Sequence, residues 1–319
     1  MLRWFRTLLI LELLAIAIVA SLIVGDPENR PDADARRDAP GRLMQLSQGV
    51  THFEHAPPAS PEQPTVVLVP GLATPYFVWD HTYSDLRNAG FGVLRYDLYG
   101  RGYSDRPAGA AHDVEFFDRQ LRDLIAALAL DTESRGPLHL GGLSMGGVIS
   151  VHFADRHPEL VRSLSLIAPA GFPLEIPAIA RFVRLPLVGD YFIHAFGHGI
   201  FMNRLHRNLY NQSLFAEYRT AFEPQMYVHG TKAALLSSLR HMPLGTSRPV
   251  YERVVQQRGV PLQLIWGPED LIVPYRVGEA MREALPAARW HSIPDGGHIV
   301  HWEKPDAVFP KLLNFLKDH

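Results

Sequence analysis

The pentapeptide Gly142-Leu143-Ser144-Met145-Gly146 lies between an apolar, strand-like run that ends at Leu140 and a helix-like run over residues 148–154. A sharp turn from strand to helix strains its central residue and needs neighbours without bulky side chains. The two glycines would therefore expose the Ser144 hydroxyl above a sheet, where it could act as a nucleophile. The alternative is a glycine-rich turn with a helix-capping serine, which the residues downstream must separate from the first interpretation.

Strand-like and helix-like runs alternate on both sides of this pentapeptide. Because parallel strands are joined through helices, the alternation predicts an α/β fold with a mostly parallel sheet flanked by helices. A segment around residues 43–54 is expected to add an antiparallel edge. The expected strands are Thr65 to Val69, Gly92 to Tyr96, Leu138 to Leu140, Leu164 to Ile167, Leu262 to Trp266 and Arg289 to Ile293, and the expected helices cover residues 76–89, 114–130, 146–156, 275–285 and 305–317.

The alternation is interrupted over residues 171–259, which read as helical and contain no convincing strand. We expect this segment to be a helical cap inserted into a core formed by residues 42–170 and 260–319. Residues 26–41 are rich in Pro, Asp and Arg without an apolar period, and they are expected to form a linker.

A serine hydroxyl becomes a good nucleophile only when a histidine accepts its proton, and an acid must fix the tautomer of that histidine. Asp270 follows the expected strand LQLIW, and His298 follows the next strand within Pro294-Asp295-Gly296-Gly297-His298. Both loops should lie at the same sheet edge as Ser144, where the sites of open parallel sheets gather. Glu269 could replace Asp270 as the acid, and His301 could replace His298 as the base.

The negative charge that forms when a serine attacks a carbonyl needs two backbone N–H donors. Met145, the residue after the nucleophile, would supply one of them. Leu72, in the loop Pro70-Gly71-Leu72-Ala73 that follows the strand TVVLV, is the best candidate for the other. Taken alone, this loop could equally be an ordinary turn at the end of a strand.

Composition sets the outer limits of the function. The chain has 319 residues, 47% hydrophobic and 20% charged, with a net charge of −2 and no cysteine. Its length suits one large α/β domain with an insertion, and its charge does not suggest a nucleic-acid partner. The absence of cysteine excludes disulfides, thiolate metal sites and a cysteine nucleophile.

Residues 1–25 differ from the rest of the chain. The segment TLLILELLAIAIVASLIV, residues 7–24, contains one charged residue, Glu12, and as a helix it would measure about 27 Å. Arg3 and Arg6 precede it and acidic residues follow it, so we expect a single-pass membrane anchor with a cytoplasmic N-terminus and the catalytic part outside. The alternative is a cleaved signal peptide and a secreted protein. The segment could also mediate a homodimer, although it has no G-x-x-x-G pattern.

Other polar groups are assigned structural roles. His194, His198 and His206 have spacings that could ligate a metal, but no carboxylate completes the set and their neighbours are aromatic and apolar. Asp97 and Arg101, in a polar, turn-rich segment, are expected to tie loops together rather than act on a substrate. We therefore expect neither a metal nor an organic cofactor.

At these residues the chain resembles the α/β-hydrolase superfamily from about residue 42 onward. The shared features are VPGL at 69–72, YDLYGRGYSD at 96–105, GLSMGG at 142–147, WGPEDLIVP at 266–274 and GGHIVHWEKP at 296–305. A serine at the nucleophile position resembles the esterase, lipase and C–C hydrolase branches. The chain departs from the usual His-Gly motif after the third strand, because Pro70-Gly71 stands there.

The resemblance implies hydrolysis of acyl esters, with Ser144 as nucleophile, His298 as base, Asp270 as its partner, and Leu72 and Met145 at the oxyanion. A membrane tether and an apolar cap look like bacterial membrane-anchored phospholipase A and monoacylglycerol-lipase-like enzymes, whose substrates are lipid esters. The alternatives are hydrolysis of a C–C bond in a vinylogous diketone and a non-catalytic binding protein. The cap residues expected to form apolar walls for an acyl chain are Phe172, Ile176, Phe182, Leu185, Leu187, Phe192, Ile193, Phe196 and Phe201.

Overall fold

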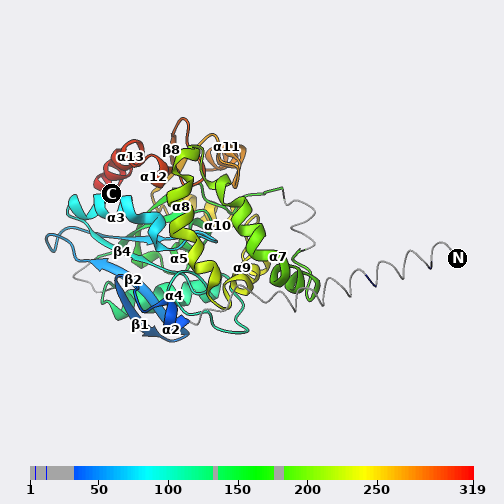
Figure 1. Ribbon diagram of the computed structural model, residues 1–319. Helices are drawn as coiled ribbons and strands as arrows, with labels where there is room; N and C mark the ends of the chain where they lie inside the picture. The colour runs from blue at the N-terminus through cyan, green and yellow to red at the C-terminus, as the bar shows by residue number, and fades with distance from the viewer. Residues whose placement is uncertain (1–3, 5–11, 13–31, 132–135, 176–182) are drawn as a thin grey trace.

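The structure is a computed structural model that describes Trp4, Glu12 and residues 32–131, 136–175 and 183–319. Its centre is an eight-stranded sheet with the order β1-β2-β4-β3-β5-β6-β7-β8 (Figure 1). The strands are β1 (Arg42–Leu46), β2 (Gly49–Ala56), β3 (Thr65–Val69), β4 (Gly92–Tyr96), β5 (Leu138–Leu143), β6 (Val161–Ile167), β7 (Leu262–Trp266) and β8 (Arg289–Ser292).

The sheet is parallel from β4 to β8, while β2 is antiparallel to both of its neighbours, β1 and β4. The predicted α/β architecture, with a mostly parallel sheet and an antiparallel edge near residues 43–54, is therefore confirmed. Strands β3, β4 and β7 are buried at every position. Strands that are covered on both faces read as continuous apolar runs, which explains why their bounds were predictable.

Helices cover both faces of the sheet, and alternate strand residues enter two separate cores. Val67 and Val69 face the core under α4 and α5, whereas Val66 and Leu68 face the core under α3, α12 and α13. Outside the segment between β6 and β7, the helices are α2 (Asp32–Ala35), η1 (Tyr76–Trp79), α3 (Asp80–Asn88), α4 (Val114–Ala127), α5 (Met145–Arg156), η2 (Pro158–Leu160), α11 (Tyr275–Ala284), α12 (Val300–Glu303) and α13 (Pro305–Asp318).

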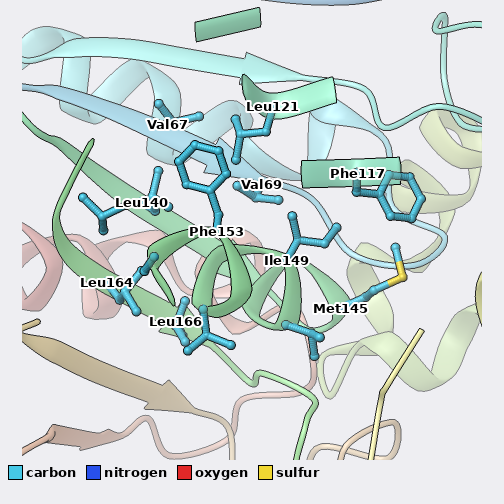
Figure 2. Packing of buried hydrophobic residues seen from close by; sticks show 14 of the residues in the cluster. Val67, Val69, Phe117, Leu121, Leu140, Met145, Ile149, Phe153, Leu164 and Leu166 are labelled. Carbon is cyan, nitrogen blue, oxygen red and sulfur yellow. The ribbon is translucent and has the colours of Figure 1, made fainter. Parts of the chain in front are cut away.

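Helix α5 follows the central strand β5 and packs directly on the sheet. Figure 2 shows Met145, Ile149 and Phe153 of this helix among side chains of the strands and of α4. All three are at most 1% exposed. Because α5 begins at Met145, this packing fixes the position of the residue that precedes it, Ser144.

Between β6 and β7 the described residues form helices, and we call residues 183–258 the helical insertion. Its helices α7 and α9 contact each other, and its aromatic residues Tyr218 and Phe222 enter the core shared with α3, α12 and α13. Its identity as a separate cap domain stays a prediction. The elements are α7 (Val188–Arg204), η3 (Leu205–Asn208), η4 (Gln212–Leu214), α8 (Phe215–Phe222), η5 (Glu223–Tyr227), α9 (Thr231–His241), α10 (Arg248–Glu252) and a π-helical turn, η6 (Arg253–Gln257).

The end of the expected linker is docked on the core. Asp32 accepts a hydrogen bond from the buried Arg106, and the Arg36 guanidinium donates to the Tyr103 carbonyl at 2.7 Å. The Pro40 carbonyl lies 2.6 Å from Nε2 of His52. Residues 32–40 are thus held by ion pairs and hydrogen bonds that composition alone does not reveal, and residues 26–31 lie outside the described residues.

No helix in the described ranges is both long and apolar enough to cross a membrane. The longest of them, α7, has 17 residues and includes the charged residues Asp190 and Arg204. This finding contradicts the expected single-pass membrane topology, with a cytoplasmic N-terminus and an external catalytic part. The segment over residues 7–24, on which that expectation depended, lies outside the described residues except for Glu12.

Candidate active site

Ser144 occupies the turn between β5 and α5 in a strained conformation. Its φ of 53° and ψ of −115° fall in a region that residues with a side chain rarely adopt. The strain is held by the backbone, because Ser144 N–H donates to the Ile167 carbonyl and Ser144 C=O accepts from Gly147 and Ala170, each at 3.0 Å. The side chain does not cap α5, and its Oγ has no hydrogen-bond partner among the described residues. The turn therefore leaves this hydroxyl free for another group.

Gly146 allows α5 to start so close to β3. A Cβ atom at this position would lie 2.6 Å from the Pro70 carbonyl oxygen and would also collide with the Val69 carbonyl. Both contacts are with backbone atoms, which cannot rotate away. Glycine is thus required for the close approach of the Ser144 turn to the loop after β3.

Asp270 and His298 form a buried pair. Nδ1 of His298 lies 2.7 Å from Oδ2 of Asp270, and the two side chains are 4% and 0% exposed. The other carboxylate oxygen, Oδ1, accepts from the backbone N–H groups of Ile272 and Val273 at 2.7 and 2.9 Å. An ionised Asp270 in this arrangement requires Nδ1 of His298 to be the donor, which leaves Nε2 able to accept a proton.

The two alternative residues lie elsewhere. Glu269 is half-buried, its Oε2 has no hydrogen-bond partner in the described structure, and the carboxylate bonded to His298 is that of Asp270. His301 is buried against the Trp79 ring, with ring centroids 4.3 Å apart. Burial lowers the pKa of His301 to about 3, so its ring is neutral at physiological pH.

The loop that carries His298 folds back over the end of β7, where it meets Asp270. Strand β8 lies three strands away from β5, which at about 4.8 Å per strand is too far for a side chain alone to span. A hydrogen bond from Glu269 N–H to the Gly296 carbonyl, at 3.2 Å, holds this loop against the loop that follows β7. Ser144, Asp270 and His298 are therefore all placed after the carboxyl ends of parallel strands, at the edge where such sites gather.

Glu303 holds the histidine loop from the other side, and the sequence did not identify it. Its buried carboxylate accepts from Gly297 N–H at 2.7 Å and from Asn211 N–H of the helical insertion. In addition, Ile299 N–H donates to the Asn208 carbonyl at 3.2 Å. A buried carboxylate thus connects the residue before His298 to the insertion. The only available signal was an acidic residue shortly after the histidine, within GGHIVHWEKP.

Three successive residues of the loop after β3 are each held by a hydrogen bond to a side chain. Gly71 N–H donates to Thr74 Oγ1 at 2.8 Å, and the Leu72 carbonyl accepts from Arg101 Nε at 2.7 Å. The Ala73 carbonyl accepts from Gln225 Nε2 of the insertion at 3.1 Å. The structure therefore supplies supports for this loop that do not depend on the usual His-Gly motif.

Within the described residues, no acceptor is found for either of the two expected oxyanion donors. Leu72 N–H makes no hydrogen bond within the described part of the chain. Met145 is the first residue of α5, so its N–H has no acceptor inside the helix. The helix N-terminus also carries a partial positive charge that favours an anion. Both N–H groups lie close to Ser144: Met145 follows it directly, and a Cβ on Gly71, the residue before Leu72, would lie 3.4 Å from Ser144 Cβ.

Asp97 and Arg101 both tie loops together. Asp97 accepts from the backbone N–H groups of Tyr76 and Tyr103 at 2.8 and 3.0 Å, and it contacts Nδ1 of the fully buried His52. The Asp97 carboxylate raises the pKa of His52 above its ordinary value, although burial acts in the opposite direction.

No cluster of three or more His, Cys, Asp or Glu side chains in the described ranges could hold a metal ion. Of the three histidines with metal-like spacing, His198 lies against the Tyr227 ring, with centroids 5.2 Å apart.

The apolar residues expected to line an acyl site have different environments. Phe172 and Ile193 are buried in hydrophobic cores, and Phe201 is partly buried. Leu187 is 83% exposed, and Leu185 and Phe196 are each 51% exposed. Ile176 and Phe182 lie outside the described residues.

Comparisons with known proteins agree with the fold and extend it to a family. A family model described as "alpha/beta hydrolase fold" matches residues 64–305. A 2-hydroxy-6-oxononadienedioate/2-hydroxy-6-oxononatrienedioate hydrolase from Paraburkholderia phymatum is 27% identical over 262 residues, which cover 79% of this chain and 86% of that protein. Lipase 3 from Moraxella sp. is 25% identical over 221 residues, covering 66% of this chain and 64% of the lipase.

Among solved structures, a thermophilic esterase from Thermogutta terrifontis superimposes with a TM-score of 0.71 at 24% identity, covering 88% of this chain and 99% of the esterase. That similarity concerns the fold alone. The family model, by contrast, spans most of the chain and includes the Ser144 turn, the Asp270 loop and the His298 loop. The chain belongs to the alpha/beta hydrolase fold family.

Proposed function

We propose that this protein is a serine hydrolase that cleaves carboxylic esters of apolar acyl chains. The observation that carries the proposal is the buried Asp270–His298 pair, at the same sheet edge as a strained Ser144 whose hydroxyl has no other partner among the described residues. A buried acid–histidine pair activates a serine when the histidine comes within hydrogen-bond reach of the hydroxyl, and all three residues follow strands at one edge of the sheet. The similarity to the lipase named above is consistent with this chemistry.

In the proposed mechanism Ser144 Oγ attacks the ester carbonyl while His298 Nε2 accepts its proton. Asp270 keeps the histidine in the required tautomer and stabilises the imidazolium that forms. Leu72 and Met145 N–H groups hold the oxyanion of the tetrahedral intermediate. His298 then protonates the departing alcohol, and water, deprotonated by the same histidine, releases the acid from the acyl-enzyme.

The proposed substrates are esters of medium or long acyl chains, such as monoacylglycerols, lysophospholipids or phospholipids. Support comes from the apolar side chains that α7 and the turn before it expose, among them Leu185, Leu187 and Phe196. Apolar side chains on the insertion would supply the apolar walls that an acyl chain needs.

A C–C bond hydrolase is the second candidate, favoured by the similarity to the 2-hydroxy-6-oxononadienedioate hydrolase. A substrate of that kind is a dianion and needs positive groups to hold it. Arg101, which is fully buried beside Leu72, already donates from Nε, Nη1 and Nη2 to protein acceptors. These three bonds hold Arg101 on the protein, and the substrate panel below separates the two candidates.

The test is hydrolysis of p-nitrophenyl esters from butyrate to palmitate, of lysophospholipid and of a vinylogous dienedioate, by the wild type and Ser144→Ala. We expect Ser144-dependent ester hydrolysis that increases with acyl length. Activity confined to the dienedioate would establish the second candidate instead. An ester activity that survives in Ser144→Ala, or none on any substrate, would refute the proposed function.

A further inference from the structure

Arg101 is a buried cation without a carboxylate partner. Its side chain is fully buried, and no Asp or Glu of the described residues lies within ion-pair distance of it. Its three hydrogen bonds all go to neutral oxygens, namely the carbonyls of Leu72 and Tyr99, at 2.7 and 2.8 Å, and Ser238 Oγ at 2.7 Å. Buried charges are normally paired because the loss of hydration is expensive. Arg101 therefore needs an explanation other than stability.

The charge is placed beside the proposed oxyanion site. Arg101 Nε donates to the carbonyl of Leu72, the residue whose N–H is the proposed oxyanion donor. A hydrogen bond from a cation is shorter and stronger than one between neutral groups, so it restricts the movement of this loop more firmly. In a dry interior the same positive charge also attracts negative charge that develops nearby.

The other two bonds make Arg101 rigid. Nη1 is held by the main chain of its own loop, and Nη2 by Ser238 on α9 of the helical insertion. The Phe117 ring lies 5.4 Å from the guanidinium carbon. Burial lowers the pKa of Arg101 to about 9, which still leaves it protonated at neutral pH.

We propose that Arg101 is a positioning residue of the oxyanion hole, which fixes the Leu72 loop and places a buried positive charge next to the developing oxyanion, a role that rests on the proposed ester hydrolysis. It does not touch the substrate. Its effect should be larger on the tetrahedral intermediate than on the bound ester, because the ester carbonyl carries much less negative charge.

Arg101→Met tests this role, since methionine keeps apolar volume and removes the charge and all three hydrogen bonds. Arg106→Met is the matched control. Arg106 is also buried, lies in the same loop and bonds to α9 through Thr231, but it is paired with Asp32 and does not contact Leu72. Each variant is assayed for kcat and KM on p-nitrophenyl butyrate, for thermal unfolding, and for inhibition by an alkyl boronic acid, which forms a tetrahedral anion on the serine.

We expect Arg101→Met to lower kcat by about 30-fold, which corresponds to roughly 2 kcal/mol, and to leave KM unchanged within about twofold. The Ki of the boronic acid should rise by about 30-fold, as kcat falls. Arg101→Lys, which retains the charge, should recover part of the loss. Arg106→Met should lower the melting temperature without a selective loss of boronic acid binding.

Equal losses in the two methionine variants, or an unchanged Ki in Arg101→Met, would overturn the role of Arg101 while leaving the ester hydrolase intact. Ester hydrolysis that does not depend on Ser144 would overturn the proposed function, and the role of Arg101 with it.

Discussion

In the proposed mechanism Asp270 fixes the tautomer of His298, and its two carboxylate oxygens have different partners. Oδ1 accepts two backbone N–H groups, while Oδ2 accepts from the histidine. An asparagine would keep its single carbonyl oxygen on the two backbone donors, so its amide N–H₂ would face Nδ1. The histidine would then have to accept at Nδ1 and carry its proton on Nε2, where it cannot take the serine proton.

Asp270→Asn should therefore lower kcat by roughly 10⁴-fold, as the same change does in a serine protease. Glu269→Gln, the adjacent change of the same type, should alter kcat by less than about threefold, because the carboxylate bonded to His298 is that of Asp270. Steady-state kinetics on p-nitrophenyl butyrate measure both. A large loss in Glu269→Gln with an active Asp270→Asn would reverse the assignment of the acid.

Glu303 is the residue whose replacement reports on the histidine loop. A glutamine can accept from only one of Gly297 and Asn211 N–H, and its own N–H₂ would face the other. Glu303→Gln should lower the free energy of unfolding by about 1 to 3 kcal/mol and reduce kcat about tenfold. Glu252→Gln, at an exposed helix pair with Arg248, should change neither. Loss of stability in Glu303→Gln with an unchanged kcat would show that the carboxylate does not position His298.

At the scale of elements, the site depends on how closely helix α5 approaches strand β3. Gly146 lies at this contact, and an added methyl group would meet the Val69 and Pro70 carbonyls. Gly199, in the middle of α7, is also a helical glycine, but a methyl group added there would meet no neighbouring residue within 4 Å. The two glycines therefore differ in their surroundings and not in their secondary structure.

Gly146→Ala should reduce the unfolding free energy by about 1 to 3 kcal/mol, through overpacking, and lower kcat by displacing the Ser144 turn. Gly199→Ala should instead stabilise the protein by about 0.5 to 1 kcal/mol, because alanine favours a helix over glycine. Urea denaturation and ester kinetics on both variants provide the test. A Gly146→Ala variant as stable and active as the wild type would mean that β3 and α5 are farther apart than described.

The elements were predictable from sequence to different degrees for a physical reason. Strands β3, β4 and β7 begin and end where expected, because burial on both faces gives a mostly apolar run that stops at a Pro, Asp or Gly. Helix α12 was not expected, since four residues show no helical period. The individual helices of the insertion were not predicted either, because which of their residues are buried depends on the core that they cover in the folded chain.

The candidate site residues also divide into those that a local sequence pattern predicts and those that it does not. Ser144, Asp270 and His298 follow strands in chain order, so a local pattern was enough to nominate each of them. The roles proposed for Arg101 and Glu303 depend on partners that are 137 and 92 residues away in the sequence, namely Ser238 and Asn211. Contacts of that range are defined only by the folded chain.

At the scale of the whole molecule, stability should be sensitive to acid. His112, His139 and His301 are buried, and burial lowers the pKa of each to about 3. Their unfolded pKa is near 6.5, so below that pH the unfolded chain binds protons that the folded chain does not. Each histidine should then reduce the unfolding free energy by roughly 2 kcal/mol between pH 7 and pH 5.

His139→Gln isolates one of these contributions away from the catalytic loops, because His139 contacts Ser163 on the neighbouring strand β6. Denaturant unfolding at pH 7 and pH 5 should show a loss of stability that is about 2 kcal/mol smaller in this variant. His52 has the opposite sign, since its pKa is raised, and its stabilisation is lost as the pH rises through that value. An identical pH dependence in the variant and the wild type would contradict the buried, neutral state of His139.

The proposed function depends above all on the assignment of Ser144 as an activated nucleophile. It is tested most directly by reaction with a fluorophosphonate, followed by intact mass measurement and peptide mapping of the wild type and Ser144→Ala. We predict one adduct per chain, on the peptide that contains Ser144, and none in the variant. Labelling of another residue, or equal labelling of Ser144→Ala, would contradict the proposed mechanism.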